Sequence, residues 1–561
     1  MEYIISSRNF EGSEKKGNLF FRGNEFKESK DSISLLEGEI IDEKEIDFKT
    51  VSELLSTSYI GNFNFLYYDI RKQKLYVKND KFGTYSLYIY SKNGDLILSN
   101  NIWNIIRLLK EEEVIISRSY FKLMLGYWGV DIDAKTLFEG VMEVNAGFNI
   151  EIDINTAEIT SSKYYSLEQD PKYSIEEATT KLDHDLDYTF SRIAKLNTDK
   201  TLGFGNSGGL DSRLVPIYAS QNNLRSIGLT TVNEKPKMFF DSITKLNAQK
   251  IANHYNIPNY CISHIVRRHD RRMVLDIRNN PFGPSQLLKN GYDQLPKFDY
   301  YVTGGNGFIV GGAWQNLLSL KSDNEFKEKF LSYHSKFNAY LWGNGNLELL
   351  NRLFSKNDQE LIASQKIRFF EQNKHKDRLS LIRSFHQFSM NKRSPSGGFE
   401  SMNRLYKTYN IYYPIVFENT LNWKAEFFPG RSVLKNLIRK KSETLYNIPS
   451  QNYDRLDGRP LSIKEKIIRR LANKYRNIGL DYENWVLDKD FMNYANEVFS
   501  RKNDLFFDYL NMSKEYFISL DIMSNLRPHV SLDFLKLKRI FDIVEYREFE
   551  IFDEEIFRIK Q

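Results

Sequence analysis

The sequence predicts two folded regions, an α+β region at residues 1–165 and an α/β region at residues 166–561. Three observations support this division. The chain has 561 residues, and a single hydrophobic core usually stops growing at about 250–300 residues. Short alternating apolar segments dominate the first part of the chain. After residue 166, strand-like and helix-like segments alternate, and this order is typical of a parallel sheet covered by helices on both faces.

The first region is expected to consist mainly of strands. Apolar and polar residues alternate in segments rich in Tyr, Ile and Val, and Gly, Asn or Asp separates these segments from one another. The segments are GNFNFLYYDI, QKLYVKND, YSLYIYSK and DLILSN. Two stretches, at 101–110 and 117–128, instead have the spacing of helices. The sequence Asn-Ala-Gly at 145–147 is predicted to be the turn of a further hairpin.

The second region begins with a predicted helix. Ser174 and Glu177 form the pattern of a capping box, and helical spacing continues from there to residue 196. Predicted strands follow at 201–205, 225–232 and 300–305, and further helices lie between them. From about residue 320 onward helical spacing dominates, so we expect a large helical part after the sheet.

Composition argues against several classes of protein. Lys and Arg number 79 and Asp and Glu 73, a net charge of +6, whereas a dedicated nucleic-acid binder concentrates positive charge. The basic clusters at 267–272 and 468–476 are either local basic patches or solvated surface. One cysteine allows no internal disulfide. No apolar run is long enough for a membrane helix, and no signal-peptide pattern opens the chain. We therefore expect a cytoplasmic protein without nucleic-acid or membrane partners.

The segment GFGNSGGLDSRLV at 203–215 lies between a predicted strand and a predicted helix, and it fits three motifs. G-x-G-x-x-G is the spacing of a dinucleotide-binding turn, for which Glu234 would be the ribose-binding acid. G-x-S-x-G is the spacing of a hydrolase nucleophile elbow, with Ser207 as the nucleophile and a downstream histidine as its base. S-G-G-x-D-S is the pattern of a pyrophosphate-binding loop. Alternatively, the glycines only allow the chain to turn.

The pyrophosphate-binding interpretation gives a role to every residue of its pattern. Gly208 and Gly209 let backbone N–H groups approach an anion closely. The helix that begins after them adds the positive end of its dipole. Ser207 and Ser212 offer hydroxyl donors to phosphate oxygens. Asp211 offers the hard oxygen ligand that Mg²⁺ prefers.

The same segment carries a resemblance to a known family. SGGLDSR after a strand resembles the ATP-pyrophosphatase loop of the asparagine synthetase family, which includes β-lactam synthetase and lasso-peptide cyclases. Residues 61–90 are similar to the glutaminase-type domain of that family, while 298–312 and 432–449 resemble parts of its synthetase half. The resemblance implies a glutaminase-like, Ntn-type sandwich domain at 1–165. It also implies an ATP-pyrophosphatase domain with a parallel sheet and a large helical part at 166–561.

The resemblance further implies which residues form the site. It places ATP and Mg²⁺ at the loop, with Asp211 as the metal ligand and Leu229 and Gly304 beside the nucleotide. Lys435 and Arg455 are candidate catalytic residues together with Asp211. The family often has a lysine shortly after Ile-Pro, and this chain offers Arg455 or Arg459 there instead.

Two further departures from the family pattern concern its chemistry. A working glutaminase domain begins with Cys after removal of Met, whereas position 2 is Glu and the cysteine of this chain is Cys261. The resemblance therefore implies the fold without glutamine hydrolysis. Family members also carry an Asp-Glu pair in the loop after the third strand, and its Asp helps to hold Mg²⁺. No acid lies between Thr303 and Gly312.

The resemblance implies an ATP-dependent ligase that adenylates a carboxylate, releases pyrophosphate and transfers the acyl group to an amine. Its partners would be small-molecule or peptide substrates. The missing Asp-Glu pair motivates the alternative, a degenerate member of the family that binds a nucleotide or a partner protein without turnover.

Overall fold

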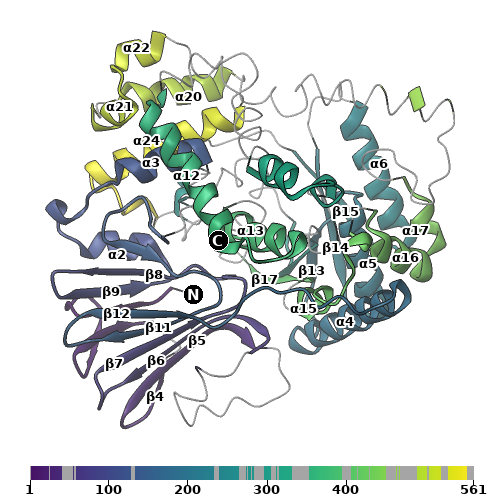
Figure 1. Cartoon of the computed structure of the whole chain (residues 1–561), viewed down its shortest axis with the longest axis horizontal. Helices are drawn as coiled ribbons and strands as arrows, with labels where there is room; N and C mark the ends of the chain where they lie inside the picture. Colours follow the sequence, from purple (N-terminus) through teal and green to yellow (C-terminus); the bar gives the residue numbers. More distant parts are fainter. Residues whose placement is uncertain are drawn as a thin grey trace.

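The chain is described here by a computed structural model (Figure 1). It describes residues 2–23, 26–40, 59–127, 133–232, 239–263, 296–304, 315–331, 353–393, 406–412, 415–428, 430–449, 489–501, 504–519 and 528–552, and short pieces at 55, 273–274, 276–278, 281–282, 311, 463, 466–467 and 470.

Two antiparallel sheets form the N-terminal region, at the lower left of Figure 1. The first sheet has the order β10-β8-β9-β1-β3-β2, with strands β1 (Ile4–Ser6), β2 (Glu14–Lys16), β3 (Leu19–Arg22), β8 (Tyr88–Lys92), β9 (Asp95–Ser99) and β10 (Val141–Glu143). The second has the order β12-β11-β7-β6-β5-β4, with strands β4 (Lys27–Glu28), β5 (Ser32–Ile40), β6 (Gly61–Asp69), β7 (Lys74–Asn79), β11 (Phe148–Asp153) and β12 (Glu158–Lys163).

Both sheets contribute to one buried cluster, so they pack face to face as a sandwich. Ile5 and Ile89 enter it from the first sheet, and Leu66 and Val77 enter it from the second. The predicted hairpin around 145–147 is wrong. Strand β10 pairs with β8 and strand β11 pairs with β7 and β12, so residues 144–147 carry the chain from one sheet to the other. Local turn residues cannot distinguish these two connections.

A five-stranded parallel sheet forms the centre of the second region and confirms the prediction of a mixed α/β fold. Its order is β15-β14-β13-β16-β17, with strands β13 (Leu202–Gly205), β14 (Ser226–Val232), β15 (Asn259–Ser263), β16 (Tyr300–Thr303) and β17 (Lys407–Asn410). Every neighbouring pair is parallel. The helices beside it are α4 (Ile175–Leu196), α5 (Leu210–Gln221), α6 (Phe239–His254), α15 (Ile415–Thr420), α16 (Ser432–Lys441) and α17 (Glu443–Asn447), with a 3-10 turn at Ala425–Phe427.

The central strand β13 separates two kinds of packing. Leu202 and Phe204 point into a large cluster shared with α4, α5 and α16. Gly203 and Gly205 lie on the opposite face, against aromatic side chains. A Cβ atom at Gly203 would lie 2.8 Å from the ring of Phe298, and one at Gly205 would lie 2.8 Å from the hydroxyl of Tyr301. These two glycines therefore serve the packing of the sheet.

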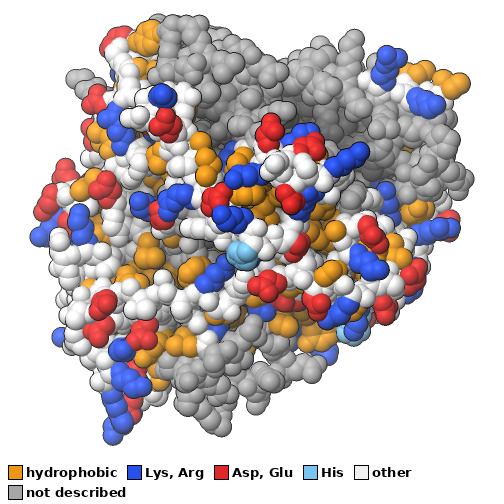
Figure 2. Space-filling view, viewed as in Figure 1, with side chains coloured by type: hydrophobic (Ala, Val, Ile, Leu, Met, Phe, Trp, Pro, Cys, Tyr) orange, Lys and Arg blue, Asp and Glu red, His pale blue; other side chains and the backbone are white. Residues whose placement is uncertain are grey.

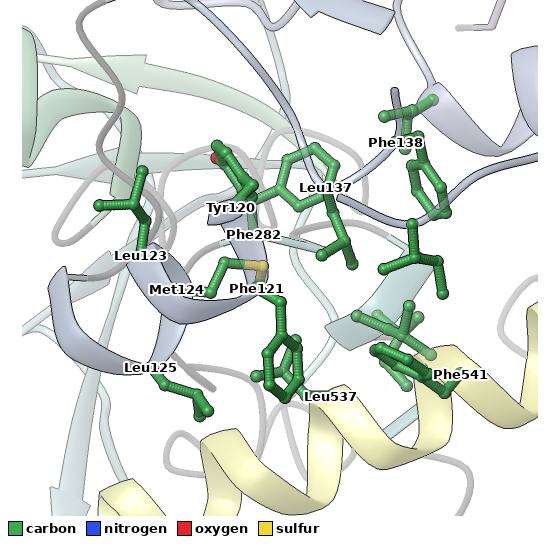
Figure 3. Packing of buried hydrophobic residues seen from close by; sticks show 14 of the residues in the cluster. Tyr120, Phe121, Leu123, Met124, Leu125, Leu137, Phe138, Phe282, Leu537 and Phe541 are labelled. Atoms are coloured by element: carbon green, nitrogen blue, oxygen red, sulfur yellow. The ribbon is translucent and has the colours of Figure 1, made fainter. Parts of the chain in front are cut away.

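A third body of helices joins distant parts of the chain, as the upper left of Figure 1 shows. It contains α2 (Ile102–Leu108), α3 (Arg118–Tyr127), α9 (Gln315–Leu318), α12 (Lys356–Asn373), α13 (Arg378–Arg393), α20 (Lys489–Ser500), α21 (Asp504–Leu510), α22 (Lys514–Ser519) and α24 (Pro528–Glu545), with a 3-10 turn at Glu111–Glu113. In Figure 3, Phe121 of α3 faces Leu537 and Phe541 of α24. The rings of Phe121 and Phe541 lie 5.5 Å apart.

The buried clusters cross the predicted boundary at residue 165, which stays a prediction. Phe82, in the loop after β7, belongs to the cluster that surrounds β13 and α5. Trp103 of α2 donates a hydrogen bond from Nε1 to the carbonyl oxygen of Ile277 at 3.0 Å. Among the described helices, none combines the length and the apolar character needed to cross a bilayer.

Candidate nucleotide-binding site

The predicted loop lies at the carboxyl end of β13, where the order of the sheet reverses. From β13 the chain proceeds through α5 to β14 and then to β15 on one side, whereas β16 lies on the other side of β13. In open α/β sheets, ligands bind in the crevice at such a switch point. The fold therefore places residues 206–209 where a parallel sheet ordinarily binds its ligand.

Gly208 and Gly209 shape the turn from strand to helix. Gly208 has φ +69°, a left-handed conformation that costs any other residue about 1–2 kcal/mol. Gly209 is the N-cap of α5, and no side chain caps this helix. The first turn of α5 therefore keeps backbone N–H donors and the positive end of its dipole for an anion.

The two serines of the loop are held close together. The hydroxyls of Ser207 and Ser212 lie 3.2 Å apart. Ser207 Oγ accepts a hydrogen bond from the N–H of Gly209 at 3.3 Å, and Ser212 Oγ donates to the carbonyl oxygen of Gly209 at 3.2 Å. Ser207 is exposed and Ser212 is buried. Ser207 can therefore meet a ligand, while Ser212 holds the turn.

Arg213 ties the loop to a distant part of the chain, and the sequence analysis did not assign it a role. Its side chain is fully buried. Its guanidinium donates hydrogen bonds to four carbonyl oxygens, those of Gly208 at 3.1 Å, Leu445 at 2.7 Å, Ile448 at 2.7 Å and Pro449 at 2.6 Å. Burial lowers the pKa of Arg213 to about 10, so it stays charged at neutral pH. The signal available in the sequence was the arginine that directly follows SGGLDS.

Asn206 fixes the loop from the other side. Its side chain is fully buried, and Nδ2 donates to the carbonyl oxygen of Ala248 at 2.9 Å and to Oδ1 of Asn259 at 3.0 Å. Its own N–H donates to the carbonyl oxygen of Leu229 at 2.8 Å. Leu229, predicted beside the nucleotide, is itself buried under the loop. It supports the loop through its backbone.

Asp211 forms an ion pair that the sequence analysis did not foresee. Its Oδ2 lies 2.9 Å from Nη1 of Arg431, and the hydroxyl of Tyr412 lies 3.5 Å from Oδ1. The side chains of Asp211 and Arg431 are 25% and 26% exposed, so a ligand can still reach both. Burial raises the pKa of Asp211, and the charge of Arg431 opposes that shift. Residues 211 and 431 are far apart in the sequence, and no local pattern links them.

The structure brings a second predicted residue to Asp211. A Cβ atom at Gly304 would lie 2.9 Å from the carbonyl oxygen of Asp211. The chain after β16 therefore passes directly against the start of α5, and only glycine allows this approach. Lys435 lies one turn after Arg431 on α16, half-buried. Arg455, Arg459, Glu234 and the loop at 305–310 lie outside the described residues.

The geometry weakens the dinucleotide-binding motif. Gly203 and Gly205 belong to β13 and pack against Phe298 and Tyr301, so they do not form a dinucleotide-binding turn. In the nucleophile-elbow interpretation, Ser207 would pair with a downstream histidine. Among the described contacts, Ser207 shares a hydrogen bond with Ser212.

The ligands for a divalent cation are few. Across the part of the chain that the structure describes, no three His, Cys, Asp or Glu residues gather as a metal site. Asp211 offers one carboxylate, and Arg431 already contacts it. A direct bond from Oδ2 of Asp211 to Mg²⁺ would therefore compete with Arg431. Mg²⁺ can still accompany a nucleotide, since this ion often keeps waters and binds mainly to phosphates.

Glu2, near the start of the described chain, takes part in an ion pair. Oε1 of Glu2 lies 2.5 Å from Nη2 of Arg278 and accepts a hydrogen bond from Asn101 at 3.0 Å. Glu2 thus links the N-terminal sandwich to the 276–278 piece.

The described part of the surface in Figure 2 carries Lys and Arg interspersed with Asp and Glu. This view shows no broad patch of one sign among its described residues.

Comparison with known proteins gives partial likenesses only. No known protein family matches the sequence, and no curated protein does. The chain is similar to an NH3-dependent NAD synthetase from Campylobacter jejuni, with 14% identity and a TM-score of 0.19 over 39% of this chain and 95% of that one. It is also similar to an NMN synthetase from Francisella tularensis, with 12% identity and a TM-score of 0.19 over 39% of this chain and 94% of that one.

A third likeness covers about half of each chain. The glutamine phosphoribosylpyrophosphate amidotransferase from B. subtilis gives 10% identity and a TM-score of 0.15 over 49% of this chain and 56% of that one. Likenesses at these TM-scores decide neither fold nor activity.

Proposed function

We propose that the chain is an ATP-dependent ligase that adenylates a carboxylate, releases pyrophosphate and passes the acyl group to an amine. One observation carries the proposal. At the switch point of a parallel sheet, Gly208 and Gly209 lead into the first turn of α5, which no side chain caps, and Arg213 and Asn206 hold that loop in place. The resemblance of SGGLDSR to the asparagine synthetase family supports the same assignment.

The loop suits the chemistry of the leaving group. When a carboxylate attacks the α-phosphorus of ATP, negative charge grows on the departing pyrophosphate. Fixed N–H donors and a helix dipole that already point at this charge lower the barrier without reorganisation. Ser207 can add a hydroxyl donor. Mg²⁺ on the phosphates would neutralise further charge when it is bound.

The amine would come from the substrates of the enzyme rather than from glutamine. Glu2 stands where a thiol nucleophile is required, and it forms the ion pair with Arg278. The carboxylate and the amine can belong to small molecules or to a peptide. A macrocycle or lactam results if both groups belong to one molecule.

The experiment is ATP–pyrophosphate exchange with a panel of amino acids, peptides and other carboxylates. We expect the wild type to exchange label with its own carboxylate. Gly208→Ala places a Cβ on a left-handed residue of the loop and should abolish exchange. Gly94→Ala is the matched control, because Gly94 has φ +81° in an open turn with no atom within 4 Å of the added Cβ.

One observation favours a second candidate, a protein that binds nucleotide without turnover. The ion pair with Arg431 occupies the one carboxylate of the loop, and no acid follows Thr303 as far as Gly312. Binding of ATP without exchange for any carboxylate of the panel would support this alternative. Exchange that persists in Gly208→Ala would contradict the role of the loop.

A further inference from the structure

We propose that Arg431, which contacts Asp211 beside the loop, is the cation that binds the pyrophosphate portion of ATP. Its guanidinium remains on Asp211 and donates other N–H groups to the pyrophosphate, so Mg²⁺ is not needed as a bridge between Asp211 and the phosphates. The inference rests on the proposed function and specifies how its site neutralises charge.

The contact itself gives the first argument. A guanidinium carries five N–H donors in a planar fork that matches phosphate geometry. Nη1 of Arg431 uses one of them on Oδ2 of Asp211 at 2.9 Å. About a quarter of the side chain remains exposed. Asp211 lies in the first turn of α5, which no side chain caps. An arginine anchored there can donate to an anion that the helix terminus already attracts.

The backbone of Arg431 gives the second argument. It is left-handed, with φ +51° and ψ +42°, at the N-cap of α16. A residue with a Cβ costs roughly 1–2 kcal/mol in this conformation, and glycine costs far less. The side chain of Arg431 does not cap α16. Among the described contacts of the Arg431 side chain, the one with Asp211 explains why an arginine stands at this position.

The loop opposite Arg431 gives the third argument. Gly311 has φ +125°, and a Cβ atom there would lie 2.6 Å from the carbonyl oxygen of Phe428 and 2.8 Å from Cγ of Arg431. The stem of Arg431 therefore fills the space that a side chain at 311 would need. A carboxylate at this position and the present placement of Arg431 exclude each other.

Charge gives the fourth argument. Asp211 and Arg431 together are neutral, so the pair adds no repulsion to a polyanion that approaches the helix terminus. No cluster of three potential metal ligands accompanies Asp211 among the residues that the structure describes. A divalent ion at Oδ2 of Asp211 would have to displace a guanidinium held at 2.9 Å, and one at Oδ1 would lie close to the positive charge of that guanidinium.

The test is calorimetric titration of inorganic pyrophosphate into the full chain, once with EDTA and once with Mg²⁺. We expect binding in EDTA, and we expect Arg431→Gly to weaken it at least tenfold. Arg431→Lys keeps the charge without the fork and should lose less. Arg431→Gly relieves the left-handed strain, so a loss of binding with an unchanged melting temperature cannot come from misfolding.

Asn223→Gly is the matched control. Asn223 is also left-handed, with φ +54°, and it lies just beyond the other end of α5 on the surface. This variant should bind pyrophosphate like the wild type. Asp211→Asn should retain binding in EDTA within a few-fold, because Arg431 remains.

The outcomes separate this inference from the proposed function. Binding in EDTA that survives Arg431→Gly overturns the role of Arg431 and leaves the loop as the site. Binding that requires Mg²⁺ and disappears in Asp211→Asn also overturns it, and makes Asp211 the metal ligand of a working loop. No binding under either condition overturns both this inference and the proposed function.

Discussion

Phe82 and Phe417 meet edge to face, with ring centroids 4.7 Å apart. Phe82 lies in the loop after β7 of the N-terminal sandwich, and Phe417 lies on α15 beside the parallel sheet. Beside them Nζ of Lys81 lies 2.7 Å from Oε1 of Glu418. One loop thus inserts an aromatic side chain into the core of the other region and places an ion pair at its rim.

Phe82→Ala should destabilise the whole chain. Phe82 is 1% exposed, and removing a buried phenylalanine usually costs about 3–5 kcal/mol. Chemical denaturation followed by fluorescence and circular dichroism measures the loss. Phe20→Ala, which truncates a partly exposed side chain of β3, should cost much less. Equal effects of the two variants would show that the inserted ring has no special role.

Deletion of residues 1–165 should give aggregated protein. The deletion uncovers the apolar surface around Phe417 and removes α3, against which Phe541 packs. Large exposed apolar patches drive association. Size-exclusion chromatography with light scattering tests this. A monodisperse fragment of residues 166–561 that melts at the temperature of the full chain would contradict it.

The purified protein should release no glutamate from glutamine. Position 2 lacks the thiol, and its carboxylate forms an ion pair with Arg278. The measurement is a coupled glutamate assay on the wild type and on Cys261→Ala, which removes the exposed free cysteine. Activity that survives in Cys261→Ala would mean that another nucleophile operates in the N-terminal region.

Ser207→Ala should weaken pyrophosphate binding without abolishing it. A hydrogen bond to a charged group contributes about 1.5–3 kcal/mol, and the backbone donors of the loop remain. Ser220→Ala, at the exposed end of α5, is the control. If Ser207 were instead a hydrolase nucleophile, the same variant would eliminate hydrolysis of activated esters completely. An esterase assay beside the titration distinguishes the two.

Stability should fall between pH 5 and pH 2, in part because of Glu113. Its carboxylate accepts two hydrogen bonds from Arg8, at 2.6 and 2.8 Å, and these lower the pKa of Glu113 to about 2. The folded-state pKa lies below the unfolded value, so this contribution is present above about pH 4.5 and is lost as the pH falls toward 2. Thermal melts of Glu113→Gln across this range should lose stability less steeply than the wild type.

The matched control is Glu112→Gln. Glu112 is exposed on the same 3-10 turn, at Glu111–Glu113. Its melting profile with pH should follow the wild type. Identical profiles for both variants would mean that the contact with Arg8 does not make the pKa of Glu113 differ between the folded and unfolded states.

Sequence patterns located the elements better than their connections. Alternation predicted the strands around 61–99, and Ser174 with Glu177 predicted the start of α4, whose capping box the structure contains. Asn145 to Gly147 looked like a hairpin turn, but the chain changes sheets there. Turn preference is local, whereas strand pairing depends on which apolar faces are buried together.

In the candidate site too, local patterns could be predicted from the sequence, whereas contacts between distant residues could not. The loop could be predicted because its glycines and serines are consecutive in the sequence. Arg431 could not, since its contact with Asp211 depends on where α16 packs against α5. Arg213 was visible beside the motif, but its acceptors, the carbonyl oxygens of Leu445, Ile448 and Pro449, come from a helix end more than 200 residues later. Side-chain identity alone does not show which distant backbone a buried arginine will meet.

The contact between Phe121 and Phe541 has a consequence for folding during synthesis on the ribosome. These residues are about 420 positions apart, and synthesis proceeds at roughly 5–20 residues per second. The part of α3 that packs against α24 therefore remains exposed to solvent for tens of seconds after α3 leaves the ribosome, until α24 has been synthesised. Contacts so distant in the sequence slow folding as well. A chain released before α24 is synthesised would leave this part of α3 exposed, and exposed apolar surface of this kind promotes aggregation.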